Sequence, residues 1–209
     1  MIRILIADNH TIVRIGLKQI LLEEYPSAII EEAGDTAELV KKVVAGKWDI
    51  VICDLNMPGR NGLDALKQIK QAFPKLPVLI MSIFPEDQYA LRVLKAGASA
   101  YLDKSSIHEE LVKAIRTVLL GKKFINSSIA EKLAEAFISG NDLPSHALLS
   151  DREFDVFKLL ASGKTVSEIA DQLSLSSNTV STYRSRILEK MNMRSNADIT
   201  RYAIEKKLI

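Results

Sequence analysis

The chain has 209 residues, of which 47% are hydrophobic and 26% are charged, and its formal net charge at pH 7 is only +2. This composition is ordinary for a globular protein and excludes a globally basic chain, so nucleic-acid binding would need a local patch. A single cysteine excludes an intrachain disulfide, and no apolar run is long enough for a signal segment or a membrane span, so we expect a cytoplasmic protein.

The first 121 residues alternate between apolar β-type runs and amphipathic helical runs. The predicted strands are 4–7, 28–33, 50–53, 78–81 and 100–102, and the predicted helices are 11–24, 36–45, 63–73, 86–95 and 107–120. A glycine or proline follows each helical run within two residues, as is typical of a helix end. Five strand–helix units predict an α/β fold with a doubly wound, five-stranded parallel sheet covered by helices on both faces.

The pattern changes after this region. An amphipathic helix is predicted at 127–139, with its apolar side chains at Ile129, Leu133, Ala136 and Phe137, and a Gly- and Pro-containing linker at 140–146 follows it. No strand pattern occurs beyond the linker. The sequence there predicts a small all-α domain with four short helices, at about 151–162, 166–173, 177–191 and 196–206.

Two of these short helices begin with capping-box signatures, in which a Ser or Thr precedes a Glu by three residues. They are Ser150 with Glu153, and Thr165 with Glu168. The predicted domains are therefore an α/β domain at 1–121 and a helical domain at 148–209, with the amphipathic helix and linker at 122–147 between them.

Polar side chains follow four of the predicted strands at the point where each strand ends. They are Asp8, Asp54, Ser82 and Lys104. Because the carboxyl ends of parallel strands lie on one rim of a sheet, we expect these groups to converge. Each residue taken alone has an ordinary explanation, such as an acid that caps a turn or a lysine that is exposed to solvent. The four together favour a site.

The chemistry of these groups suits phosphoryl transfer. Asp54 is an oxygen nucleophile, and Asp8 offers a carboxylate to Mg²⁺, a hard cation that binds through one or two carboxylates plus phosphate and water. Lys104 supplies a compact positive charge for a phosphoryl oxygen, and the Ser82 hydroxyl can donate a hydrogen bond to the same group. The backbone carbonyl of Asn56 is a further candidate ligand for the cation.

This set of motifs resembles the receiver domain of two-component response regulators over roughly residues 1–121. The resemblance rests on the Asp8 turn, Asp54 followed by Met57-Pro58-Gly59, Ser82, Tyr101 and Lys104. It implies the strand order 2-1-3-4-5 and a sensor histidine kinase whose phosphohistidine supplies the phosphoryl group to Asp54. It also implies a switch in which Ser82 moves to the phosphoryl group while the Tyr101 ring turns inward.

One position departs from the family's pattern. The family has two adjacent acids after the first strand, whereas here the second is Asn9. The implied cation ligands are thus Asp8, Asn9, Asp54 and the Asn56 carbonyl, and we expect a weaker affinity for Mg²⁺. A regulator that binds DNA without phosphorylation is the alternative. We expect His10 to be a surface residue of the first helical turn, with no cluster of metal-ligating partners.

The helical domain contains a helix-turn-helix pattern at about 166–190. The first helix turns Ile169, Ala170 and Leu173 inward, and the second turns Val180, Ile187 and Met191 inward. The opposite face of the second helix carries small hydrogen-bonding and cationic groups suited to base edges and phosphates. These groups are Asn178, Thr179, Ser181, Thr182, Arg184, Ser185, Arg186 and Lys190.

The amino-acid sequence of this region is similar to that of the DNA-binding domain of NarL/FixJ-type regulators, also called the LuxR-type helix-turn-helix, over about residues 146–209. The similar segments are 149–153, 168–170 and 179–184. The resemblance implies that Ser181, Thr182 and Ser185 reach the major groove and that Asn178 and Thr179 lie near phosphates. Arg184, Arg186 and Lys190 are the candidate phosphate contacts. The resemblance also implies that the last helix contacts the second copy of the chain in a dimer.

The combined prediction is a response regulator and transcription factor rather than an enzyme. Its partners would be a sensor kinase, promoter DNA, a second copy of the chain when active, and RNA polymerase. A Mg²⁺-dependent phosphatase would usually need an Asp-x-Asp pattern, and Asn56 occupies the second place. A flavin or nucleotide binder would need a glycine-rich loop after the first strand, and residues 8–12 contain no glycine.

Overall fold

The computed structural model describes residues 1–57, 62–84, 86–138, 145–206 and 208–209, with the side chains of 86–88, 132–133 and 135–138 left aside. The chain divides into two compact units, Met1–Ala134 and Glu135–Ile209, and each is described by itself. The predicted Pro58-Gly59 motif, most of the predicted linker and three of the four predicted apolar side chains of the amphipathic helix lie outside the described residues. The predicted domain boundaries remain a prediction.

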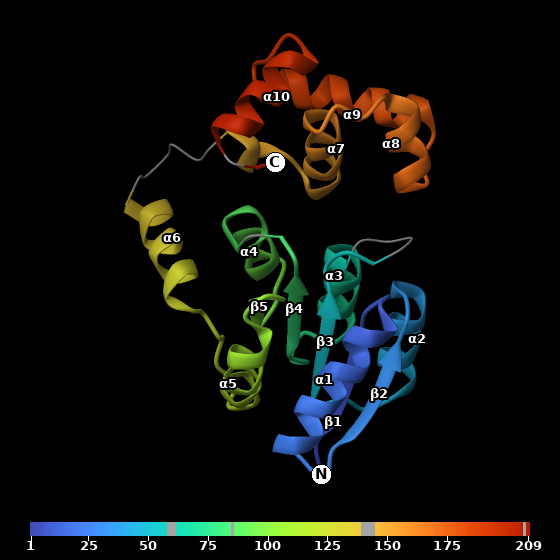
Figure 1. Ribbon diagram of the computed structural model, residues 1–209, viewed down its shortest axis with the longest axis vertical. Coiled ribbons are helices and arrows are strands. Elements are labelled where there is room, and N and C mark those ends of the chain that lie inside the picture. The colour runs from blue at the N-terminus through green and yellow to red at the C-terminus, as the bar shows by residue number, and fades with distance from the viewer. Residues whose placement is uncertain (58–61, 85, 139–144, 207) are drawn as a thin grey trace. The chain divides into compact units, whose positions relative to one another are not determined.

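The first unit holds a five-stranded parallel sheet in the order β2-β1-β3-β4-β5, which confirms the predicted fold (Figure 1). The strands are β1 Arg3–Ala7, β2 Ile29–Ala33, β3 Ile50–Asp54, β4 Val78–Ser82 and β5 Ala100–Asp103. The helices of the α/β pattern are α1 Thr11–Glu24, α2 Thr36–Ala45, α3 Gly62–Ala72, α4 Glu86–Lys95 and α5 Ile107–Leu119, and α6 Ser127–Ile138 follows them. Most predicted bounds agree within one or two residues.

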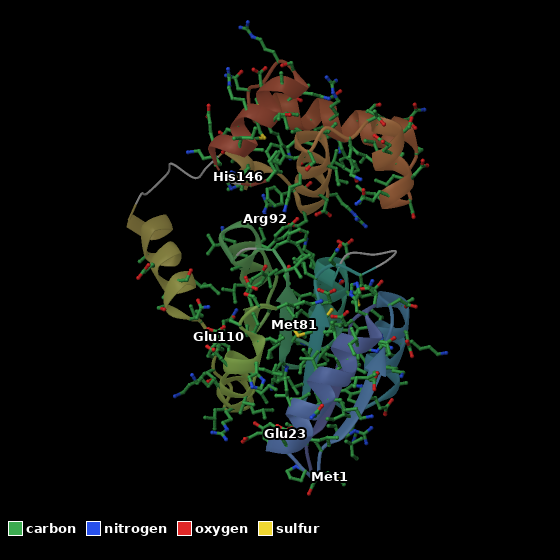
Figure 2. All side chains as sticks on the ribbon, in the orientation of Figure 1. Met1, Glu23, Met81, Arg92, Glu110 and His146 are labelled. Carbon is green, nitrogen blue, oxygen red and sulfur yellow. The ribbon has the colours of Figure 1, made fainter. Side chains whose placement is uncertain are left out.

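The sheet is apolar on both faces, which is why its strands read as continuous apolar runs. On one face, alternate residues such as Ile6, Ile52 and Met81 form a buried cluster with Leu21 of α1 and Ile115 of α5. Figure 2 labels Met81 in the middle of the strands. Successive strand residues point to opposite faces, so the intervening buried residues belong to the other face. This closed core fixes the strand ends that carry the polar groups.

The second unit consists of short helices. They are the 3-10 helix η1 Ser145–Leu148, followed by α7 Asp151–Ala161, α8 Val166–Leu173, α9 Ser177–Lys190 and α10 Asn196–Glu205. Both predicted capping boxes are present, and a third, unpredicted one joins Ser195 and Asp198 at the start of α10. The third escaped prediction because an Asp replaces the usual Glu or Gln. No described helix has the length and apolar character needed to cross a membrane.

Two residues of the predicted linker are ordered in the second unit. Residues 145 and 146 begin η1. The His146 ring lies 5.9 Å from the Phe154 ring between centroids, and its Nδ1 lies 3.0 Å from the Tyr202 hydroxyl. These contacts join residues far apart in the chain, so a pattern of Gly, Pro and polar residues could not reveal them.

Candidate functional site

Two buried carboxylates and one amine meet at the carboxyl end of the sheet. Asp8 follows β1 and Asp54 ends β3, and these strands are neighbours with Ala7 paired to Cys53. The Asp8 and Asp54 side chains are only 0% and 3% exposed, and Lys104 Nζ lies 2.7 Å from Asp8 Oδ2 and 3.0 Å from Asp54 Oδ2. The predicted convergence of these three residues is therefore what the structure shows.

The electrostatics of Asp54 follow from this placement. Burial raises the pKa of the Asp54 carboxyl, and the nearby Asp8 charge raises it further. The Lys104 charge and hydrogen bonds from Lys104 and the Asn56 backbone N–H lower the pKa, but the net shift is upward. Two adjacent buried acids with one partly compensating amine still favour additional positive charge. The pair therefore suits a divalent cation.

The turn after Asp8 corrects the expectation for His10. The His10 backbone N–H donates to Asp8 Oδ1 at 2.8 Å, and His10 Nδ1 lies 3.1 Å from the same oxygen. One ligand atom each from Asp8, His10 and Asp54 lie within 4.8 Å of one another, so His10 belongs to a group that could hold a metal ion, although it is a surface residue as expected. Asn9 is exposed and adds no charge. Asp8 and His10 are separated by one residue in the sequence, and this spacing could have predicted that their side chains lie together.

Ser82 and Tyr101 both hold the loop that follows β4. Ser82 ends β4 and is fully buried, and its hydroxyl accepts a hydrogen bond from the Phe84 backbone N–H at 3.0 Å. The Tyr101 ring is also fully buried, and its hydroxyl donates to the Phe84 carbonyl at 2.7 Å. The Phe84 ring stacks on Tyr89 of α4 at 5.1 Å. The two predicted switch residues are thus linked through one loop residue.

Two positioning residues were missed by the sequence reading. Arg14 of α1 donates from Nη1 to the Asp8 carbonyl at 2.7 Å and from Nε to Glu32 at 3.0 Å, so it clamps the Asp8 turn. Gly62 starts α3, where an added Cβ would overlap the Asp54 carbonyl oxygen and lie 2.9 Å from Leu55 Cα. A glycine at the first residue of a helix is a weak sign of such close approach. Nothing in the local pattern marked Arg14.

The helix-turn-helix lies in α8 and α9 of the second unit. Val180 and Ile187 of α9 are buried, as is Met191 just beyond its end, and Ile169 and Ala170 of α8 are buried beside a half-buried Leu173. The Ser176 hydroxyl caps α9 by accepting from the Thr179 N–H. Most of the predicted contact residues are exposed, namely Asn178, Ser181, Thr182, Ser185, Arg186 and Lys190, while Thr179 and Arg184 are half-buried.

Two of the three candidate phosphate cations also hold the unit together. Arg184 Nε donates to Asn196 of α10 at 2.7 Å. Lys190 Nζ lies 2.6 Å from Oε2 of Glu153, whose side chain is 3% exposed. Burial raises the pKa of Glu153, but hydrogen bonds from Lys190 and Ser150 outweigh it and lower the pKa overall. Arg186 alone of the three has no ion pair or hydrogen-bond partner within the described residues.

Comparison with known families follows the same division of the chain. Residues 4–116 match the response regulator receiver domain, and residues 147–203 match the bacterial regulatory proteins of the luxR family. The paired acids on a doubly wound sheet and the helix-turn-helix define a response regulator. The chain belongs to the response regulators that join a receiver to a LuxR-type DNA-binding domain, the NarL/FixJ family.

Relatives and solved structures agree with this assignment. The oxygen regulatory protein NreC of Staphylococcus epidermidis is 34% identical over 99% of both chains, and NreC of Staphylococcus carnosus is also 34% identical over 99% of both. RcsB from Salmonella enterica serovar Typhimurium, bound to promoter rprA with the phosphomimetic BeF3−, is 25% identical with a TM-score of 0.67. That match covers 97% of this chain and 98% of RcsB.

Proposed function

We propose that Asp54 is the phosphoacceptor of this regulator and that a sensor histidine kinase is the donor. The observation that carries the proposal is the Asp8–Lys104–Asp54 cluster at the carboxyl end of the sheet. Asp54 brings an oxygen nucleophile, and Lys104 brings a cation 3.0 Å from it. Positioning and charge compensation supply most of the catalysis in phosphoryl transfer, and this cluster offers both.

The transfer itself forms one bond and breaks one. A carboxylate oxygen of Asp54 attacks phosphorus, and the bond from phosphorus to the kinase histidine nitrogen breaks with its electron pair staying on that nitrogen. The kinase histidine leaves as neutral imidazole because a proton is carried on its other ring nitrogen. Lys104 and the Ser82 hydroxyl would hold phosphoryl oxygens. The residues proposed to hold Mg²⁺ are Asp8, Asn9, Asp54 and the Asn56 carbonyl. The cation, when bound, offsets the charge on the phosphoryl oxygens.

The switch would begin at Ser82. A phosphoryl group adds about −1.5 to −2 charges beside Asp54. A Ser82 hydroxyl drawn to that group would lose its hydrogen bond from the Phe84 N–H. The position of Tyr101 would then change as well, because the Tyr101 hydroxyl donates to the carbonyl of the same residue. The loop after β4 and α4 would then favour one of two existing arrangements. This route uses contacts that lie within the first unit alone.

The output is proposed to be binding to double-stranded promoter DNA as a homodimer. The exposed face of α9 carries small polar side chains for base edges and Arg186 for phosphate. Structures of RcsB dimers on DNA support this form of complex. A dimer would place two copies of α9 about 34 Å apart on a two-fold site. RNA polymerase is a further proposed partner.

A second mode of action has specific support, namely DNA binding without phosphorylation. Asn9 removes one negative charge from the cation site. Lys104 already bridges both acids, and the Tyr101 ring is already buried, which is the inward position that the family's switch gives to the active form. The two modes differ in one respect that can be measured, which is whether Asp54 is required for DNA binding.

Selection of DNA from a random duplex pool tests the proposal. Wild type and Asp54→Asn are each incubated with the pool, with and without a small-molecule phosphodonor and Mg²⁺. Phosphodonor-treated wild type is expected to enrich a two-fold symmetric sequence with half-sites about one helical turn apart, and the variant is not. Equal enrichment by untreated wild type and by the variant would overturn phosphorylation control in favour of the second mode.

A further inference from the structure

A nitrogen donor lies beside the two acids of the proposed cation site, whereas a magnesium site takes oxygen ligands. His10 Nδ1 lies 3.1 Å from Asp8 Oδ1, and the ligand atoms of Asp8, His10 and Asp54 lie within 4.8 Å of one another. Lys104 contacts the other oxygen of Asp8, Oδ2, at 2.7 Å. The imidazole and the ammonium therefore approach different oxygens of Asp8, and the imidazole does not compete with the amine for the same atom.

His10 is held in this place by the backbone. It is the N-cap residue of α1, and its side chain makes no capping hydrogen bond but contacts Asp8 Oδ1 through Nδ1. Its backbone N–H is fixed to Asp8 Oδ1 at 2.8 Å, and Arg14 clamps the Asp8 carbonyl at 2.7 Å. The imidazole side chain is 60% exposed. A cation arriving from solvent thus meets a positioned nitrogen that is still accessible.

We propose that His10 makes this site select a first-row transition-metal ion, of the zinc or cobalt type, over Mg²⁺. Mg²⁺ takes oxygen ligands and benefits from negative charge, and Asn9 supplies a neutral amide where the family supplies a carboxylate. Imidazole suits Zn²⁺ and its neighbours, which also accept carboxylate oxygens. The donor set of two carboxylates and one imidazole therefore fits such an ion better than it fits Mg²⁺. The inference rests on the proposed function because the two share Asp8 and Asp54.

Calorimetric titration of the untagged full chain with Co²⁺ and with Mg²⁺ tests the proposal. Wild type is expected to bind one Co²⁺ at least about 10-fold more tightly than Mg²⁺. His10→Gln is expected to lose about 10- to 100-fold in Co²⁺ affinity with little change for Mg²⁺, and to alter the visible absorption spectrum of bound Co²⁺. His108→Gln is the matched control, since His108 is an exposed histidine near the start of α5, away from Asp8 and Asp54 in the chain. It should behave as wild type.

An unchanged Co²⁺ affinity and spectrum in His10→Gln would overturn the inference, as would tighter binding of Mg²⁺ than of Co²⁺ by wild type. The mass gain after phosphodonor treatment separates these results from failure of the proposed function. A Mg²⁺-dependent gain at Asp54 together with no effect of His10→Gln would reject the nitrogen ligand alone. Absence of any cation binding and of any mass gain would reject both. An Asn9→Asp variant should restore preference toward Mg²⁺ by supplying the missing carboxylate.

Discussion

Lys104 and Asp54 form an ion pair across the sheet, with Lys104 Nζ 3.0 Å from Asp54 Oδ2, although their strands β5 and β3 are separated by β4. The pair exists because both residues lie at the carboxyl ends of parallel strands. Lys104 contacts Asp8 as well, so one amine compensates two buried acids. We therefore expect the charge of Lys104 to affect both the stability of the receiver and the chemistry of Asp54.

Replacing Lys104 by Met should therefore destabilise the receiver. Two carboxylates that are nearly inaccessible to solvent would lose their cation, and removing one partner of a buried ion pair costs about 3 kcal/mol or more. Urea unfolding followed by the fluorescence of Trp48, the only tryptophan, reports on this unit. Lys41→Met, at an exposed position of α2, is the control. Equal stabilities for the two variants would contradict the ion-pair interpretation.

The raised pKa of Asp54 gives a pH dependence with a defined sign. An acid whose pKa is higher in the folded state binds more protons there, so its contribution to stability is complete below the ordinary pKa of about 4 and is lost as pH rises through the raised pKa. In the presence of a chelator, wild type should lose stability relative to Asp54→Asn as pH rises from about 4 to 7. A relative gain by wild type over that window would show that Lys104 outweighs burial.

Gly62 should be intolerant of even one added carbon. A Cβ there would overlap the Asp54 carbonyl and approach Leu55 Cα to 2.9 Å, so the backbone that carries Asp54 would have to move. Overpacking of this kind costs about 1–3 kcal/mol, and Gly62→Ala should also slow phosphorylation. Gly16→Ala is the control, because nothing lies within 4 Å of a Cβ there and alanine favours the α1 helix. Similar phosphorylation rates and stabilities for the two variants would count against the close-approach role.

Substitutions of Lys190 and Arg186 should distinguish a structural role in α9 from a role in DNA contact. Lys190 pairs with the buried Glu153, so Lys190→Met should lower local stability by about 1 kcal/mol and speed hydrogen exchange in 177–190. Arg186→Met should leave exchange unchanged, while weakening DNA binding at all sequences and reducing its salt slope by about 1. Unaltered exchange in Lys190→Met would mean that the ion pair contributes little to the unit.

The parallel sheet, the helices and the convergence of Asp8, Asp54 and Lys104 follow from local patterns in the sequence, whereas the strand order was implied by the resemblance to the receiver domain. Apolar runs that end in Asp8, Asp54 or Lys104 are visible without a structure, since strand ends and rim positions depend only on local order along the chain. The resemblance to the receiver and LuxR-type domains added the switch residues and the DNA-contact face.

Two of the contacts that escaped prediction depend on the reach of a long side chain. Arg14 contacts Asp8 through a long guanidinium, and Lys190 crosses from α9 to Glu153 of α7. Neither has a local pattern, because a surface lysine or arginine looks the same whether it meets solvent or a buried acid. His10 is exposed, as predicted, but its place beside Asp8 and Asp54 was not predicted, since one histidine near one acid is common in sequences.

The most direct test of Asp54 as phosphoacceptor is the intact mass of the protein after incubation with a small-molecule phosphodonor. Wild type and Asp54→Asn are compared with and without Mg²⁺. We expect wild type to gain the mass of one phosphoryl group only with the cation, and the variant to gain none. No gain in wild type would contradict the assignment of Asp54 and favour DNA binding without phosphorylation. An equal gain in Asp54→Asn would contradict the assignment by placing the phosphoryl group on another residue.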